Sequence, residues 1–343
     1  MTCAETALWG ILQYYGTRYK EYKAALPHDI VGIVDNESFE RVSPSRGLHY
    51  SHTSKVLKKF DFSPRIYNTE NKSDKSVNNK GFERCLHYYV ESGIPLMVGI
   101  GFVDKQVGHL ILCIGREKQE LPETIKYKNE GRKEKYQIAN SADFTQNYIF
   151  MDDNKIPFTR NALDDFQYKN SQHKKEETKI KYFIVPLYKR IFLTAEEAER
   201  IFYQILTNET LGLKNISPAP TPVIIRIFLA TSRNYKTHKF NALSKSYKVL
   251  DRIPLPKFVW VCEISTEEQF KNGKVCGEIV LDATAAKHDD LDSILLLRYP
   301  KRFAHKLNGE TMKDLKQKLQ KNASRLEEEF NSFNLNLKEV GNE

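Results

Sequence analysis

The chain has 343 residues, of which 40% are hydrophobic and 28% charged, and its formal net charge is +9. This balance excludes an intrinsically disordered chain, and the length predicts two domains of about 150–200 residues each. The longest apolar run, residues 94–103, is too short to cross a bilayer, so no membrane span is expected. No secretory signal is visible near the start of the sequence, which predicts a cytoplasmic location.

Basic residues and cysteines both favour ordinary structural roles in most of the chain. The excess of lysine and arginine is spread along the sequence, which indicates a solvated surface, so no nucleic-acid partner is expected. The five cysteines include no Cys-x-x-Cys pair, so neither a disulfide framework nor a zinc ribbon is predicted. Four of them are expected to be small buried hydrophobes: Cys85, Cys113, Cys262 and Cys276.

The first predicted element is a helix over residues 3–16. Apolar side chains recur there at helical spacing, and Gly16 is the predicted end of the helix. Thr2 and Glu5 have the Thr-x-x-Glu spacing of a capping box. This box starts the helix at Thr2 and places Cys3 in its first turn.

Two further helices are predicted at residues 52–60 and 82–92, with a polar loop over 68–80 between them. The pattern then becomes extended. Apolar runs at 94–102 and 109–115 flank a polar turn, which predicts a β-hairpin.

The rest of the first half predicts more strands. Residues 136–139 and 148–151 are expected to pair with each other, and residues 182–187 form a last strand. The charged segment 117–135 is expected to be a surface excursion. Because helices precede strands, the sequence predicts an α+β domain with separate layers over residues 1–190.

The second half, residues 191–343, is expected to be an additional α+β domain of unknown function. Residues 195–206 predict a helix, and residues 309–330 predict a charged terminal helix. Four strand candidates lie between these helices: 223–231, 257–264, 276–282 and 293–298.

Cys3 is the residue whose position changes its expected chemistry. The free amides and the dipole at the start of a helix favour the thiolate, and the same amides can stabilise an oxyanion. A thiolate needs a proton-transfer partner, usually histidine, which in turn needs an orienting carboxylate or amide. His109 opens the second strand of the hairpin directly after Gly108, and Asp152 ends a later strand. The sequence therefore predicts a site made of Cys3, His109 and Asp152.

The segments that carry these residues resemble the papain-like cysteine peptidases, especially the bacterial C39-like branch. Residues 2–16 are similar to the nucleophile helix, residues 93–115 to the histidine hairpin, and residues 148–153 to the strand that ends in the triad aspartate. The resemblance covers roughly the first 190 residues. It implies a papain-like domain with a helical layer against an antiparallel sheet. It also implies a cysteine peptidase with Cys3 as nucleophile, His109 as general base and then acid, and Asp152 as the orienting residue.

Alternatives remain open for single residues. Asp153 competes with Asp152 for the orienting role, and so does Asn140, which lies in a segment similar to the amide-bearing segment of other papain-like enzymes. The sequence favours Asp152 because it directly ends the strand. The structural alternatives are a buried thiol at Cys3 and a polar turn at Asp152.

The sequence departs from the family in one respect. The family usually places a glutamine several residues before the cysteine, as a donor to the oxyanion hole, whereas only Met1 and Thr2 precede Cys3 here. Either the sequence begins late or the site works without this donor. No metal or organic cofactor is expected, and the expected partner is a peptide or protein substrate. The alternative functions are acyl transfer of the transglutaminase or deamidase type on the same fold, and a binding module without catalysis.

Overall fold

The protein has an α+β fold, as the sequence predicts, with helices and mainly antiparallel sheets. None of the described helices combines the length and the apolarity that a bilayer crossing needs. The computed structural model describes residues 3–37, 48–69, 79–102, 108–131, 135–169, 175–217, 221–241, 250, 253–285, 290–307, 309–321 and 328–336.

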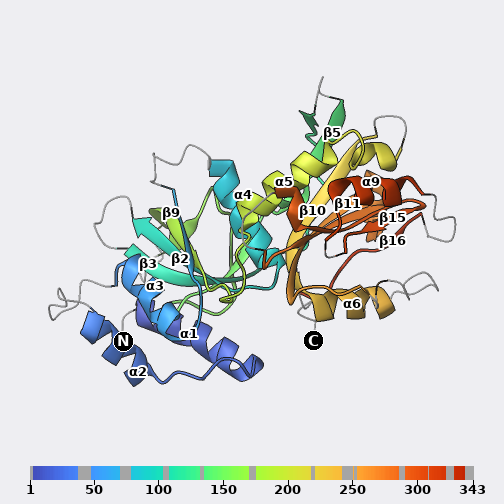
Figure 1. The fold of residues 1–343 in the computed structure, drawn as a ribbon. Helices are drawn as coiled ribbons and strands as arrows, with labels where there is room; N and C mark the ends of the chain where they lie inside the picture. Colours follow the sequence, from blue (N-terminus) through green and yellow to red (C-terminus); the bar gives the residue numbers. More distant parts are fainter. Residues whose placement is uncertain are drawn as a thin grey trace. The chain divides into compact units, whose positions relative to one another are not determined.

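The chain forms two compact units. Figure 1 shows the chain with its colours running from blue at the N-terminus to red at the C-terminus. The first unit comprises Met1–Lys118 and Thr145–Lys189, and the second comprises Gln119–Phe144 and Arg190–Glu343. The sequence predicts one continuous domain over residues 1–190. The structure differs because residues 119–144 leave the first unit and belong to the second.

The first unit combines helices with one large antiparallel sheet. Its helices are α1 (Cys3–Arg18), α2 (Pro27–Glu37), α3 (Tyr50–Lys59) and α4 (Asn79–Glu91). Its strands are β1 (Arg65–Asn68), β2 (Leu96–Phe102), β3 (Gly108–Arg116), β6 (Tyr148–Met151), β7 (Thr159–Asn161), β8 (Gln167–Lys169) and β9 (Lys175–Val185). The strand order is β1-β9-β2-β3-β6-β7, and β8 also pairs with β9.

The predicted hairpin is confirmed, since β2 and β3 pair antiparallel from Leu96↔Cys113 to Gly101↔Gly108. The helices predicted at 52–60 and 82–92 are α3 and α4, each of which begins slightly earlier. Thr2 of the predicted capping box, the turn at 103–107 and most of the loop predicted at 68–80 lie outside the described residues.

Helix α1 continues to Arg18, so the predicted end at Gly16 is wrong. A Cβ on Gly16 would lie 2.7 Å from the backbone nitrogen of Ala24. Gly16 therefore lets the following chain pass close to the helix instead of ending it. A glycine inside a helix costs only about 1 kcal/mol relative to alanine, which the surrounding packing offsets.

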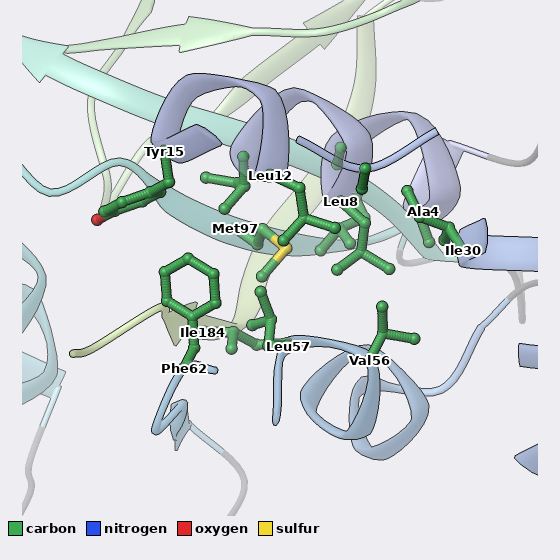
Figure 2. Close-up of a cluster of buried hydrophobic side chains, with 14 of the residues drawn as sticks. Ala4, Leu8, Leu12, Tyr15, Ile30, Val56, Leu57, Phe62, Met97 and Ile184 are labelled. Carbon is green, nitrogen blue, oxygen red and sulfur yellow. The ribbon is translucent and has the colours of Figure 1, made fainter. Parts of the chain in front are cut away.

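One face of α1 builds the core of the first unit (Figure 2). Leu8, Ile11, Leu12 and Tyr15 recur at helical spacing and are at most 1% exposed. Burial of each aliphatic side chain contributes about 2 kcal/mol. Their partners come from the sheet, from α3 and from the chain after α3: Met97, Leu110, Ile184, Val56, Leu57 and Phe62. This packing holds the first turn of α1, and with it Cys3, against the sheet.

The strand pair predicted from residues 136–139 and 148–151 is wrong as a pair. Both strands exist, but β5 (Tyr136–Asn140) pairs in parallel with β10 (Val223–Thr231) in the second unit. Strand β6 instead pairs with β3. Strand β4 (Lys128–Glu130), which lies within the predicted excursion, pairs with β5. The local pattern predicts a strand but does not say which partner the strand takes.

The second unit is built around another large sheet with the order β15-β14-β13-β11-β10-β5-β4. Its further strands are β11 (Phe258–Ser265), β12 (Lys274–Val275), β13 (Gly277–Asp282), β14 (Ile294–Tyr299), β15 (Arg302–His305) and β16 (Phe330–Asn331). Its α-helices are α5 (Ala195–Leu206), α6 (Ser232–Asn241), α8 (Glu267–Lys271) and α9 (Met312–Gln320). The described residues of this unit also include the short 3-10 helices η2 (Ser141–Phe144), η3 (Leu213–Asn215) and η5 (Asp290–Ser293).

The helix predicted at 195–206 and the four predicted strands of this half are confirmed. The terminal helix predicted over 309–330 is too long. Thr311 caps the start of α9 through a capping box with Asp314, but α9 ends at Gln320. Phe330 is part of β16, which pairs with β12. The backbone at Phe330 therefore takes part in strand pairing and not in a helix.

Candidate active site

Cys3 is the first residue of α1, and its side chain is partly exposed. Burial would raise the pKa of its thiol, but a hydrogen bond with His109, a hydrogen bond from the backbone N–H of Leu110 and the charge of His109 outweigh burial and lower the pKa. The charge of Asp153 acts in the opposite direction. A thiol with a lowered pKa has a larger thiolate fraction at neutral pH, which makes it a better nucleophile.

His109 is the second residue of β3, and its side chain is only 8% exposed. Its Nε2 lies 2.8 Å from Oδ1 of Asp152. Because Asp152 engages Nε2, Nδ1 is the ring nitrogen left for the hydrogen bond with Cys3. Burial would lower the pKa of His109, but the hydrogen bonds and charges of Asp152 and Cys3 raise it to about 10. The imidazole is thus held in its protonated form beside the sulfur.

Asp152 directly follows β6, and strand pairing explains its position. Met151 is the Cα partner of Leu112, so the next residue along the chain returns toward the start of β3, where His109 lies. The carboxylate of Asp152 also accepts the backbone N–H of Asn154 at 2.9 Å. Burial would raise the pKa of Asp152, but these hydrogen bonds and the charge of His109 lower it below its usual value.

The two other candidates for the orienting role are placed differently. Oδ1 of Asp153 lies 3.9 Å from Nε2 of His109, and its side chain is 32% exposed, against 3% for Asp152. Asn140 belongs to β5 in the second unit, where its Oδ1 accepts the N–H of Ala142 at 3.0 Å. The structure therefore brings Cys3, His109 and Asp152 together and gives the amide of Asn140 another partner.

Tyr168 is a member of the site that the sequence does not indicate. It lies on the short strand β8, and its hydroxyl hydrogen-bonds to Asp152. Its ring stands edge-on to the ring of His109, with the centroids 5.8 Å apart, and Nζ of Lys155 lies 4.6 Å from its centroid. Tyr168 supports both the carboxylate and the imidazole. A lone tyrosine in a polar stretch carries no sequence signal for this role.

Tyr182 of β9 is a second aromatic neighbour of the site. Burial, and after it the negative charge of Cys3, raises the pKa of Tyr182 to about 12. Gly99 of β2 is the Cα partner of Tyr182 on one side and of Leu110 on the other. The backbone N–H of Leu110 donates to the sulfur of Cys3. Tyr182, Gly99 and Leu110 are therefore neighbours across three strands, and the last of them contacts the nucleophile.

His109, Asp152 and Asp153 also have the donor types of a metal site, and their ligand atoms lie within 4.8 Å of one another. Metal–nitrogen and metal–oxygen bonds of about 2.0–2.2 Å in a tetrahedral site separate two ligand atoms by more than a hydrogen-bond length. Nε2 and Oδ1 are 2.8 Å apart, so an ion would have to replace the bond between them. The arrangement fits proton transfer better than metal ligation.

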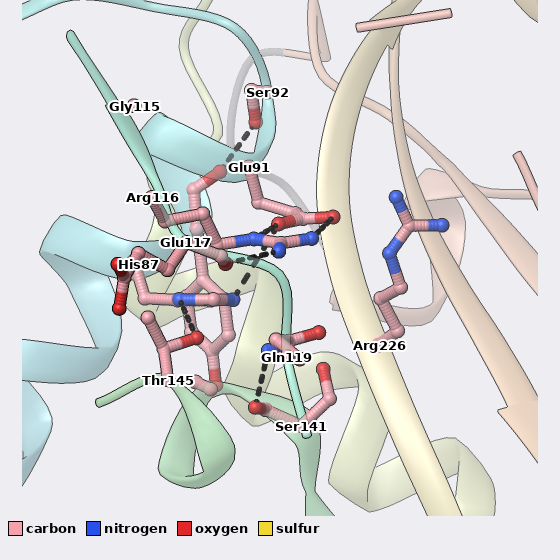
Figure 3. A network of polar contacts seen from close by, with 12 residues as sticks. His87, Glu91, Ser92, Gly115, Arg116, Glu117, Gln119, Ser141, Thr145 and Arg226 are labelled. Atoms are coloured by element: carbon pink, nitrogen blue, oxygen red, sulfur yellow. Dashed lines mark hydrogen bonds and ion pairs between the residues drawn. The ribbon is translucent and has the colours of Figure 1, made fainter. Parts of the chain in front are cut away.

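A buried polar network anchors β3, which carries His109, and β6, which directly precedes Asp152 (Figure 3). Arg116 ends β3 and donates through Nε and Nη2 to the carboxylate of Glu91 on α4, the second bond being 3.0 Å long. Tyr148 begins β6, and its hydroxyl lies 3.0 Å from Nδ1 of His87 on α4. Both strands are thereby fixed to the same helix at the ends opposite the site.

The assembled groups are of the types that nucleophilic catalysis uses. A sulfur with a lowered pKa can attack a carbonyl carbon, and a protonated imidazole can deliver a proton to the leaving group. A scan against models of protein families gave no match to this chain, and a search of the curated proteins gave none either.

Proposed function

We propose that the chain is a cysteine-dependent hydrolase, most simply a peptidase, which works through Cys3, His109 and Asp152. The observation that carries this proposal is that one imidazole is hydrogen-bonded to a thiol with a lowered pKa and to a buried carboxylate. That is the arrangement of a thiolate–imidazolium pair with an orienting group. The resemblance of the three segments to papain-like peptidases supports the same assignment.

In the proposed reaction, Sγ of Cys3 attacks the carbonyl carbon of the scissile amide, and the carbonyl oxygen becomes an oxyanion. Backbone N–H groups at the start of α1 stabilise this oxyanion. His109 donates its proton to the leaving amine as the C–N bond breaks, and a thioester remains on Cys3. His109 then takes a proton from water, whose oxygen attacks the thioester and releases the carboxylic acid and the thiolate. Asp152 keeps the ring oriented throughout.

The first test is covalent labelling with iodoacetamide at pH 7, read by intact mass and peptide mapping. We expect a single fast adduct at Cys3, because the other cysteines are all buried. The Cys3→Ala variant should lose this adduct while keeping its circular dichroism spectrum. An equally fast adduct on a folded Cys3→Ala chain would contradict the proposal.

The second test identifies the reaction. The chain is incubated with a mixture of peptides and casein, and the products are weighed by mass spectrometry. Hydrolysis adds the mass of water across a cleaved bond, whereas acyl transfer to an added primary amine adds the mass of that amine minus ammonia at glutamine. A reactive Cys3 with neither product would favour a binding module.

A further inference from the structure

Four charged residues form a line across the sheet of the second unit. Arg226 of β10 is the Cα partner of Glu263 of β11, which is the partner of Glu278 of β13. Glu278 is in turn the partner of Arg298 of β14. Directly opposed residues of neighbouring antiparallel strands lie on the same face of a sheet, so these four side chains share one face. We call them the charged row.

Lys239 of α6 forms ion pairs with two members of the charged row. Its Nζ lies 2.8 Å from Glu278 and 3.5 Å from Glu263. Arg226 lies 2.9 Å from Glu263, and Arg298 lies 3.7 Å from Glu278. Lys239, Glu263, Glu278 and Arg298 are at most 2% exposed. Apolar side chains generally stabilise a core at least as well as buried ion pairs do, so stability alone does not account for this cluster.

Residues 328–336, which we call the C-terminal segment, lie against the charged row and the neighbouring part of β10 through two aromatic rings. The ring centroid of Phe330 lies 3.6 Å from Cζ of Arg298 and 4.3 Å from Nζ of Lys239. The ring of Phe333 stacks on Phe228 of β10, with the centroids 4.9 Å apart and an interplanar angle of 12°. One ring is therefore held by two cations and the other by an aromatic partner.

The charged row also binds the main chain of this segment. Glu263 Oε1 accepts the N–H of Phe333 at 2.8 Å, and Nη1 of Arg226 donates to the carbonyl of the same residue at 2.6 Å. Strand β16 within the segment adds to β12, and the side chain of Asn336 donates to the carbonyl of Leu229 at 2.7 Å. Main-chain hydrogen bonds, strand addition and spaced aromatic anchors are the contacts with which proteins bind extended peptides.

We infer that the charged row and α6 form a recognition site for an extended peptide with the pattern Phe-x-x-Phe, and that the chain's own C-terminal segment occupies this site. The ligand class is a segment of a partner protein that carries this pattern and displaces the C-terminal segment. Within the body Lys239 is paired with Glu278 and Arg226 with Glu263, so these four charges keep their partners when the segment leaves. This inference is independent of the chemistry at Cys3.

The test compares the unmodified 343-residue chain with its Phe330→Ala/Phe333→Ala variant. Fluorescence anisotropy measures binding of a labelled synthetic peptide with the sequence of residues 328–336. We expect the double variant to bind the peptide at least about ten-fold more tightly than the unmodified chain, in which the tethered segment competes at an effective concentration on the order of millimolar. A peptide with both phenylalanines replaced by alanine should not bind. Phe192→Ala, at a phenylalanine that is 54% exposed, is the matched control and should behave as the unmodified chain does.

Equal peptide affinity of the two chains, or no binding by a folded double variant, would overturn the inference. If the double variant does not fold, hydrogen exchange of the unmodified chain decides. We expect the amide of Phe333 to exchange at least about 100-fold faster than the slowest amides of β11, as a displaceable segment must. Equal protection of Phe333 and β11 would show that the segment is a fixed part of the core, and would also overturn the inference.

Discussion

The ring of Tyr182 occupies the space that a side chain on Gly99 would need. A Cβ on Gly99 would lie 2.2 Å from Cε1 and 2.3 Å from Cζ of Tyr182. Gly99 stands between Tyr182 and Leu110 in the sheet, and the N–H of Leu110 bonds to the sulfur of Cys3. Because glycine has no side chain, the ring of Tyr182 can lie over Gly99, close to Cys3.

The Gly99→Ala variant should therefore be less stable and should label more slowly at Cys3. The methyl group forces the ring of Tyr182 to move, which we expect to cost about 1–3 kcal/mol of unfolding free energy in urea titrations. Gly32→Ala is the matched control, because no atom lies within 4 Å of a Cβ at that position in α2. We expect this control to be neutral or up to about 1 kcal/mol more stable. The same loss in both variants would contradict the role of the close contact.

The rate of alkylation of Cys3 should depend on pH through His109. The pKa of the Cys3 thiol is lowered, so the labelling rate should rise at a lower pH than the rate of an ordinary exposed cysteine does. In His109→Gln the imidazolium charge is lost while burial remains, so the thiol pKa moves up and the thiolate fraction at pH 7 falls. A shift of one pKa unit reduces the rate at pH 7 about ten-fold. Stopped-flow labelling between pH 5 and 10 would measure the rate for both chains. Identical pH–rate profiles of the unmodified chain and His109→Gln would exclude an ion pair between Cys3 and His109.

Asp152→Asn and Asp153→Asn should shift the same profile in opposite directions. Asp152 supports the raised pKa of His109, so its loss weakens the imidazolium and moves the inflection of Cys3 to higher pH. The charge of Asp153 raises the pKa of Cys3, so its removal moves the inflection to lower pH. For peptide turnover we expect a loss on the order of 10²–10⁴ for Asp152→Asn, from the lost orientation of the base. Shifts of the same sign in both variants would refute the assignment of roles.

Removing Arg116 should strongly destabilise the first unit. The side chain of Glu91 is 0% exposed and that of Arg116 is 12% exposed, so Arg116→Met removes the guanidinium from a buried carboxylate. We expect a loss of about 3–5 kcal/mol in unfolding free energy, with partial recovery in the double variant Glu91→Met/Arg116→Met. Lys128→Met, in a pair whose lysine is 73% exposed, is the control and should cost less than about 1 kcal/mol. No recovery in the double variant would argue against the ion pair as the cause.

Local patterns were sufficient to predict the elements that carry the candidate site. The amphipathic spacing of α1 and the two apolar runs around a polar turn depend on near neighbours in the sequence, and the structure confirms this helix and this hairpin. They place Cys3 at a helix start and His109 at a strand start. The structure adds that β6 pairs with β3, which brings Asp152 to the imidazole.

Contacts between distant segments could not be predicted in this way. The sequence shows that 136–139 is a strand, but its parallel pairing with β10 depends on residues far along the chain. Phe330 was expected in a helix, yet its ring lies against Arg298 and Lys239, which no local spacing reveals. The hydroxyl of Tyr168 likewise reaches Asp152 only through the pairing of β8 with β9.

The chain leaves the first unit and returns to it at nearly the same point. The N–H of Glu117 donates to the carbonyl of Asn147 at 3.0 Å, and Nδ2 of Asn147 donates to Glu117 at 2.9 Å. A cut at residue 190 would separate β5 from β10 and uncover residues 138–140, which are at most 2% exposed. A self-sufficient version of the first unit would instead be obtained by deleting residues 119–144 and closing the gap with a short turn, a rearrangement that truncation from either end cannot reproduce.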